Sequence, residues 1–131
     1  MLVGESNNLY KTDKERIFMF IINDLEKILK KVIEVYKCTY EGGICAIYLY
    51  GSYARGTYTD TSDVDIAAVV KGERKELQNK LKQVWDEVSD ISLEYDIVIS
   101  PTVIPYDEFE NYKEILPYYK NILNEGVKIS A

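Results

Sequence analysis

The chain has 131 residues, of which 47% are hydrophobic and 29% are charged, as in one folded domain, and no run of about 18 apolar residues offers a membrane span. A formal net charge of -6 disfavours free nucleic acid as the main partner, and without histidine Cys38 and Cys45 are too few ligands for a structural zinc site. The first ten residues lack the basic and apolar layout of a signal peptide, so we expect a cytoplasmic domain over residues 1–131.

The first half of the chain predicts one long helix and two strands. After a polar start over residues 1–11, which we expect to be loose, apolar residues at helical spacing predict a helix from about Asp13 to Lys37. The short apolar run Ile44–Tyr50 predicts a strand. A turn or short helix is expected within Ser52–Thr61, and Val64–Val70 predicts a second strand, buried on both faces.

The second half predicts a helix, a strand and two shorter helices. Helical spacing extends from Glu73 to Asp90 and places Trp85 in the core. Leu93–Ser100 predicts a third strand, which Pro101 should end. The remaining expected features are helical segments at Tyr106–Ile115 and Pro117–Asn124 and a C-cap at Gly126. This order predicts an α/β or α+β domain with a small sheet covered by helices.

Two aspartates at the start of the second predicted strand are the clearest candidates for chemistry. Asp63 and Asp65 are two residues apart, so their side chains leave the same face of a strand, roughly 7 Å apart at the backbone. Carboxylates in this arrangement are able to converge on two metal ions about 4 Å apart, as in two-metal phosphoryl transfer. Because the strand is predicted to be buried, unpaired carboxylates here would destabilise the folded state unless a cation bound to them.

A glycine–serine pair lies where the first predicted strand ends. Gly51 would let the backbone approach a ligand closely, and the hydroxyl of Ser52 is able to bond a phosphate oxygen. A plain turn is the alternative interpretation of such a pair. Arg55 either neutralises a phosphate or lies in solvent.

Gly51-Ser52, ten intervening residues and Asp63-Val64-Asp65 together resemble the signature of the polymerase-beta-like nucleotidyltransferases, and the run with Arg55-Gly56 resembles their minimal nucleotidyltransferase branch. The resemblance extends over roughly residues 44–126. It implies a mixed sheet with helices packed on it, a triphosphate at Gly51, Ser52 and Arg55, and two Mg²⁺ ions held by Asp63, Asp65 and a third carboxylate from a later strand.

Asp96 is the expected third carboxylate. It lies in the middle of the predicted strand Leu93–Ser100, with apolar neighbours on both sides. Glu94 would share its face by the period of two, so the sequence does not exclude it. A structural ion pair is the alternative role for Asp96.

The resemblance to antitoxins of the minimal nucleotidyltransferase type, which accompany HEPN-domain toxins, implies transfer of AMP from ATP to a hydroxyl of the partner toxin. The chain is too short for a separate acceptor domain, which is consistent with a protein acceptor. Two alternatives are nucleotidylation of a small hydroxylated molecule such as an antibiotic, and a protein that only blocks its partner without catalysis. The acceptor, the preferred base and the oligomeric state are not encoded in any recognisable motif.

Overall fold

The computed structural model describes residues 13–130 of the chain, with side chains from Asp24 onward. The expectation for residues 1–11 lies outside the described residues. The elements in chain order are α1 (Asp13–Tyr40), β1 (Ile44–Tyr50), α2 (Ser52–Arg55), β2 (Val64–Val70), α3 (Arg74–Tyr95), β3 (Ile99–Pro105), α4 (Tyr106–Tyr112), α5 (Pro117–Glu125) and β4 (Val127–Ser130). In this part of the chain, none of the helices has the length and apolar character needed to cross a membrane.

The strands form one mixed sheet in the order β3-β2-β1-β4. β2 runs parallel to β3, whereas β1 is antiparallel to both β2 and β4. The predicted fold class, a small mixed sheet covered by helices, is therefore confirmed. The short strand β4 was not predicted, because its four residues carry no run of apolar side chains that would distinguish a strand from a tail.

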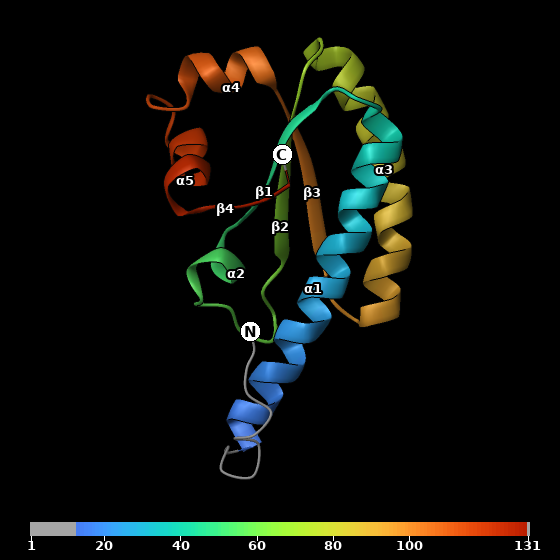
Figure 1. Ribbon diagram of the computed structural model, residues 1–131, viewed down its shortest axis with the longest axis vertical. Helices are drawn as coiled ribbons and strands as arrows, with labels where there is room; N and C mark the ends of the chain where they lie inside the picture. Colours follow the sequence, from blue (N-terminus) through green and yellow to red (C-terminus); the bar gives the residue numbers. More distant parts are fainter. Residues whose placement is uncertain (1–12, 131) are drawn as a thin grey trace.

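The sheet is covered by helices on both faces, and Figure 1 shows it nearly edge-on between α1 and α3 on one side and α2, α4 and α5 on the other. Alternate residues of β2 divide between two cores. Val64, Ile66, Ala68 and Val70 belong to the core under α1 and α3, while Ala67 and Val69 pack with residues of α4 and α5. The prediction that β2 is buried on both faces is therefore confirmed, and alternation assigns Asp65 to the face of α4 and α5.

Two tyrosines of α1 fasten this helix to the sheet and to α3. The hydroxyl of the fully buried Tyr36 lies 2.8 Å from the carbonyl oxygen of Thr102 in β3, to which it donates. The hydroxyl of Tyr40 donates to the carbonyl of Leu77 in α3 at 2.8 Å. The helix continues past the predicted end at Lys37 because Tyr40, one turn after Tyr36, is buried as well.

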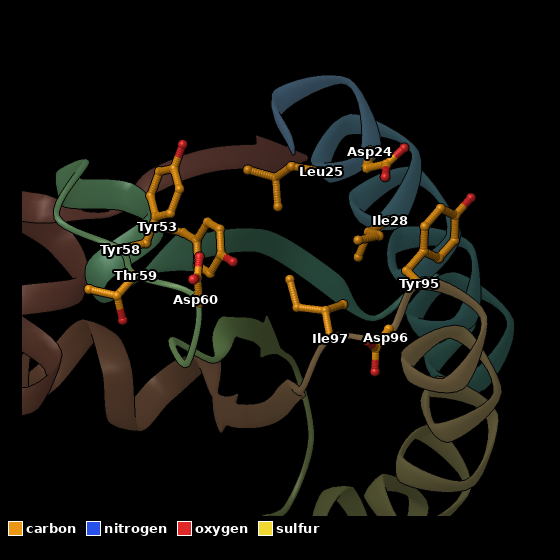
Figure 2. Close-up of a pocket in the computed structure, with 10 residues that line it drawn as sticks. All are labelled: Asp24, Leu25, Ile28, Tyr53, Tyr58, Thr59, Asp60, Tyr95, Asp96 and Ile97. Atoms are coloured by element: carbon orange, nitrogen blue, oxygen red, sulfur yellow. The ribbon is translucent and has the colours of Figure 1, made fainter. Parts of the chain in front are cut away.

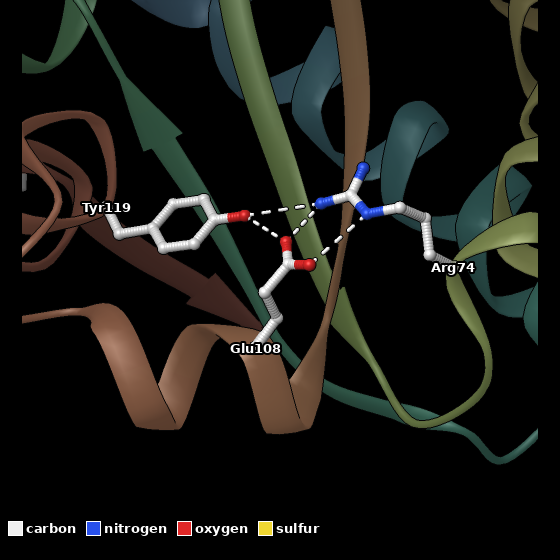
Figure 3. A network of polar contacts seen from close by, with 3 residues as sticks. All are labelled: Arg74, Glu108 and Tyr119. Atoms are coloured by element: carbon white, nitrogen blue, oxygen red, sulfur yellow. Dashed lines mark hydrogen bonds and ion pairs between the residues drawn. The ribbon is translucent and has the colours of Figure 1, made fainter.

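A polar contact connects α3 with the two helices on the opposite side of the sheet. Figure 3 shows the guanidinium of Arg74, at the start of α3, paired with the carboxylate of Glu108 in α4. The hydroxyl of Tyr119 in α5 donates to the same carboxylate. The nearby guanidinium and then the hydroxyl lower the pKa of Glu108. Because Arg74 is largely exposed, this network orients the helices more than it stabilises the fold.

The prediction of a third strand at Leu93–Ser100 was wrong for its first six residues. α3 continues from Asp90 to Tyr95, because Ile91 is buried one turn after Val88 and keeps the apolar face of the helix against the core. The strand instead covers Ile99–Pro105 and contains Pro101. Pro101 is tolerated there because β3 is an edge strand, where a missing N–H donor removes no ladder hydrogen bond on the open side.

Trp85 was predicted to lie in the core, and this was wrong. Its side chain is 45% exposed, whereas Val84 and Val88 of the same helix are buried. The helical spacing with Leu81 and Val88 was real, but Trp85 lies at the margin of the buried stripe, so part of its indole reaches solvent.

The turn after β1 requires glycine at position 51. Gly51 has φ 76° and ψ -156°, a backbone conformation open almost only to glycine, and a Cβ there would collide with the carboxylate of Asp65. Its carbonyl accepts the N–H groups of Ala54 and Arg55, both at 3.1 Å, which closes α2 directly after the strand. The absence of a side chain therefore allows α2 to begin in contact with Asp65.

We expect Gly51→Ala to destabilise the fold by about 1–3 kcal/mol, since it adds backbone strain and displaces the Asp65 carboxylate. Gly56→Ala is the matched control, because Gly56 has a similar φ of 77° but open space around its Cβ position. Chemical denaturation of both variants measures the difference. If Gly51→Ala cost no more than Gly56→Ala, the proposed contact with Asp65 would be wrong.

Candidate active site

The two aspartates of β2 lie together at one end of the sheet. Val64 between them is fully buried in the core of α1 and α3, so Asp63 and Asp65 emerge on the opposite face. Asp65 is partly buried and Asp63 is exposed. Burial, and then the negative charge of Asp63, raise the pKa of Asp65. The fold thus holds two like charges close together. A cation placed between them would offset both the burial of Asp65 and its repulsion from Asp63.

The loop that precedes Asp63 is closed by two hydrogen bonds between Thr59 and Ser62. The amide of Thr59 donates to the hydroxyl of Ser62 at 2.8 Å, and the amide of Ser62 donates to the carbonyl of Thr59 at 3.1 Å. The amide of Val64 then joins the backbone of the segment before β3 by donating to the carbonyl of Val98 at 2.8 Å. Asp63 is therefore held between a hydrogen-bonded loop and the first pairing of β2.

Asp65 is flanked by residues of both neighbouring strands. Its backbone partner in β1 is Tyr50, whose hydroxyl lies 2.9 Å from the hydroxyl of Tyr118 in α5. The two rings meet edge to face with centroids 5.9 Å apart. Burial, and then the hydrogen bond with Tyr118, raise the pKa of Tyr50. The two phenol rings lie side by side on the α5 side of Asp65.

The predicted phosphate-binding residues lie beside this carboxylate. Gly51 contacts it, and Ser52 opens α2 as a partly buried residue. Arg55, the last residue of α2, lies 3.6 Å from Glu125 between Nη1 and Oε1, with both side chains about half exposed. Its positive charge also acts on Asp65 and lowers the pKa of that carboxyl, opposing the larger effects of burial and Asp63. The structure thus gathers Gly51, Ser52, Arg55, Asp63 and Asp65 at one place.

Asp96 does not lie in a strand, and its predicted placement was wrong. It is the exposed C-cap of α3, with the left-handed backbone angles φ 51° and ψ 50°. Glu94, the alternative third carboxylate, lies in α3 and pairs with Lys31 at 3.0 Å between Oε1 and Nζ. Among the side chains described, from Asp24 to Ser130, no three acidic, histidine or cysteine groups lie together so as to hold a metal ion. The strand placement of Asp96 was therefore wrong, and its role as the third metal ligand stays a prediction.

Asp96 instead borders a hollow of about 260 Å³ between α1, the loop after α2 and the end of α3. Figure 2 shows Tyr53 and Tyr58 on one side of this hollow, with Leu25, Ile28 and Tyr95 on the other. The rings of Tyr53 and Tyr58 stack with centroids 4.5 Å apart and an interplanar angle of 5°. Tyr53 packs against the core of α1 and α3, so this hollow adjoins the face of the sheet opposite to Asp65.

Ser100 is a residue of the site that sequence reasoning missed. It is the parallel pairing partner of Asp65 in β3, and paired residues of parallel strands direct their side chains to the same face. Strand spacing places their Cα atoms about 4.8 Å apart. The predicted strand Leu93–Ser100 contained Ser100, but its pairing with Asp65 depends on strand register, which has no short-range sequence signal.

The residues that the fold brings together fit a magnesium ion bound jointly with a triphosphate. Mg²⁺ in nucleotide enzymes is typically held by one or two carboxylates, and phosphate oxygens and water complete its octahedron. Asp63 and Asp65 supply two carboxylates on one face. Among the described residues, neither carboxylate accepts a hydrogen bond, and the hydrogen bonds of this segment are those of its backbone. The pair is therefore available for a cation.

Comparison with known proteins agrees with this geometry. Residues 25–129 match the model of the family described as the nucleotidyltransferase domain. The candidate protein adenylyltransferase MJ0604 of Methanocaldococcus jannaschii is 35% identical over 101 residues, which cover 77% of this chain and 93% of that protein. MJ0141 of the same organism, also a candidate protein adenylyltransferase, is 44% identical over 73 residues, covering 50% of this chain and 72% of that protein.

Among solved structures, a toxin–antitoxin complex crystallised with AMP-PNP is similar to this chain with a TM-score of 0.46 and 17% identity. The similarity covers 76% of this chain and 69% of that chain. The family match spans the site from α1 to β4, and the relative MJ0604 is covered over nearly its whole length. The chain belongs to the nucleotidyltransferase domain family and is an enzyme of that class.

Proposed function

We propose that this nucleotidyltransferase transfers AMP from ATP to a hydroxyl of a partner protein, in the manner expected of an antitoxin that modifies a HEPN-type toxin. The observation that carries the proposal is the placement of Asp63 and Asp65 on one face, beside the Gly51-Ser52 turn. A close like-charge pair next to a turn with a free hydroxyl suits a metal-bound triphosphate. The names of the archaeal relatives favour a protein as the acceptor.

In the proposed reaction, the acceptor oxygen attacks the α-phosphorus of ATP while the bond from that phosphorus to the bridging oxygen of pyrophosphate breaks. The acceptor proton passes to water or to a carboxylate of the site. Bound Mg²⁺ would neutralise the triphosphate and the departing pyrophosphate. Asp63 and Asp65 would hold that ion, the hydroxyl of Ser52 would orient a terminal phosphate oxygen, and Arg55 would exchange Glu125 for a phosphate.

The surface beside the site supports a protein acceptor. An apolar groove of about 330 Å³ runs along the edge of the molecule between α3 and the start of β3. Leu93 and Val98, which line it, are 81% and 59% exposed. Val98 also pairs through its carbonyl with Val64, immediately after Asp63. Exposed apolar surface beside the strand that pairs with the start of β2 suits a protein partner better than a small polar substrate.

The charge of the chain is a second argument for this partner. A formal net charge of -6 would attract a basic protein surface and repel free nucleic acid. A hydroxyl on a basic protein would therefore be drawn toward the site, whereas a polynucleotide would not.

Asp65→Asn is expected to abolish nucleotidyl transfer without weakening the fold. The change removes a metal-binding charge but keeps the side-chain volume. Because the folded pKa of Asp65 is raised, ionisation of this group opposes folding as pH rises through that pKa, so the neutral variant should be at least as stable as the wild type at pH 7 without ligands.

Thermal unfolding with and without Mg²⁺ and a non-hydrolysable ATP analogue measures both effects. At a hundred times Kd the ligand should stabilise the wild type by about 2.7 kcal/mol, and the variant should gain nothing comparable. Lys120→Gln is a control that changes an exposed charge in α5 outside the proposed site. Equal turnover of Asp65→Asn and wild type would refute the assigned role.

Ser52→Ala should slow transfer roughly 10- to 1000-fold, the range for loss of one well-placed hydrogen-bond donor. The metal ion should still bind, because Ser52 is proposed to contact phosphate and not the cation. Steady-state kinetics with saturating Mg²⁺ test this. An unchanged rate in Ser52→Ala would return Gly51-Ser52 to the status of a plain turn.

Incubation of the purified chain with its partner protein, ATP and Mg²⁺ should add about 329 Da per AMP unit to one partner residue, measured by intact-mass and peptide mass spectrometry. Leu93→Asp should reduce this modification by disrupting the apolar groove, while nucleotide-dependent stabilisation stays at the wild-type level. A partner that binds but is never modified would favour the blocking protein. Modification of a small hydroxylated molecule instead would favour the other enzymatic alternative.

A further inference from the structure

We propose that the apolar groove between α3 and β3 receives an amphipathic helix of the partner protein, with apolar side chains in the groove and basic residues along one flank. The inference rests on the proposed function, because it names the part of the partner that this chain binds. The lining of the groove, the free edge of β3 and the charges beside them each favour this occupant.

The lining of the groove offers few polar groups to a ligand. Trp85, Leu93 and Val98 are its exposed apolar side chains, and its polar groups are two serine hydroxyls and the indole N–H of Trp85. One of these hydroxyls, that of Ser89, donates to the carbonyl of Trp85 within α3 at 2.8 Å. A partner backbone entering the groove would therefore find little to replace its hydrogen bonds to water. A helix avoids this cost, because its backbone groups are already paired.

The free edge of β3 is poorly suited to an added strand. The amide of Val64 donates to the carbonyl of Val98, and Val64 is paired with Ile99, so even-numbered residues of β3 direct their peptide groups toward β2. The odd-numbered residues face outward and alternate between an N–H donor and a proline: Ile99, Pro101, Val103 and Pro105. An extended segment along this edge would lose every second N–H donor of β3.

The order of large and small residues on α3 suits a second helix. Trp85, Ser89 and Leu93 follow one another at intervals of four residues and so form one ridge of the helix. The small Ser89 between two large side chains leaves a notch, which a side chain of another helix is able to enter. Leu93 is 81% exposed, so most of its surface is free to contact that helix.

The row of residues beside this ridge favours a basic flank on the occupant. It carries Lys82, Asp86 and Asp90, all of them exposed. Among the described residues neither aspartate forms an ion pair, whereas Glu94, the next residue of the row, pairs with Lys31. Lysine or arginine residues facing Asp86 and Asp90 would complement this row. The formal net charge of -6 also disfavours a second copy of this chain as the occupant.

Selection from a displayed library of random peptides about 15 residues long, which is enough for a helix to form on binding, identifies the chemistry of the occupant. The immobilised chain is the target, and peptides that also bind the Leu93→Asp variant are discarded. The retained peptides should carry apolar residues at helical spacing with Lys or Arg beside them, and they should become helical on binding, as measured by circular dichroism. Thermal unfolding establishes that each variant of the chain is folded.

A retained peptide should bind Trp85→Ala roughly tenfold or more weakly than the wild type, as for loss of a buried aromatic contact. Neutralising both aspartates, in Asp86→Asn with Asp90→Asn, should weaken binding roughly two- to fivefold, the range for exposed ion pairs. Ile115→Asp changes an exposed apolar side chain outside the groove and should bind the peptide as the wild type does. Retained peptides with alternating apolar residues or with acidic flanks would overturn the inference, as would a selection that yields no peptide dependent on Leu93.

The retained peptide should also inhibit modification of the partner protein, while stabilisation of the chain by Mg²⁺ and the ATP analogue is unchanged. A peptide that occupies the groove without inhibiting modification would overturn the inference and leave the proposed function standing. So would a wild-type dimer that Leu93→Asp dissociates in analytical ultracentrifugation, because the occupant would then be a second copy of the chain. Absence of transfer in the reaction without peptide would overturn the proposed function instead, and the selection would still decide whether the groove binds a helix.

Discussion

The candidate site depends on the close contact between the backbone of Gly51 and the side-chain carboxylate of Asp65. Gly51 lies against the Asp65 side chain in a conformation that other residues rarely adopt, and a Cβ at this position would overlap with that carboxylate. The contact joins the end of β1, the beginning of α2 and the start of β2. Ser52 and Arg55 are near the acidic pair only because α2 begins there. The position of the proposed phosphate-binding residues therefore follows from one glycine.

The electrostatic cost of the site is the second constraint. Asp65 is partly buried beside Asp63, and both effects raise its pKa, with partial relief from Arg55. Holding two carboxylates in this way opposes folding unless a cation compensates them, which is why the pair favours the proposed metal-binding role. The rigid sheet makes the arrangement persist, since Val64 between the two aspartates is fixed in the core. The fold thus supplies preorganised negative charge, which a bound cation would compensate in the proposed function.

The residues that local spacing determines could be predicted from the sequence, and those that depend on strand pairing could not. Gly51, Ser52, Asp63 and Asp65 lie within fifteen consecutive residues between two apolar strands, so their convergence needed no knowledge of the remaining chain. Both strands were predicted with the bounds that the structure gives.

The end of α3 shows why the features that depend on strand pairing could not be predicted from the sequence. The run Leu93–Ile99 has strand-like composition, but burial of Ile91 and packing of Tyr95 keep the chain helical through Tyr95. That shift moved Asp96 out of the sheet, and the register of β3 pairs Ser100 with Asp65. Tertiary packing decided between helix and strand, and the register of a parallel pair has no short-range sequence signal. The junction between α3 and β3 was therefore the least predictable part of the structure near the candidate site.

The most direct test of the account is a crystal structure of the chain with Mn²⁺ and a non-hydrolysable ATP analogue, with the ion located by its anomalous scattering. The account predicts a peak between the carboxylates of Asp63 and Asp65, with triphosphate oxygens completing its coordination and a terminal phosphate at Ser52. A strong peak at Asp60 and Asp96, or a nucleotide bound away from Asp63 and Asp65, would contradict it.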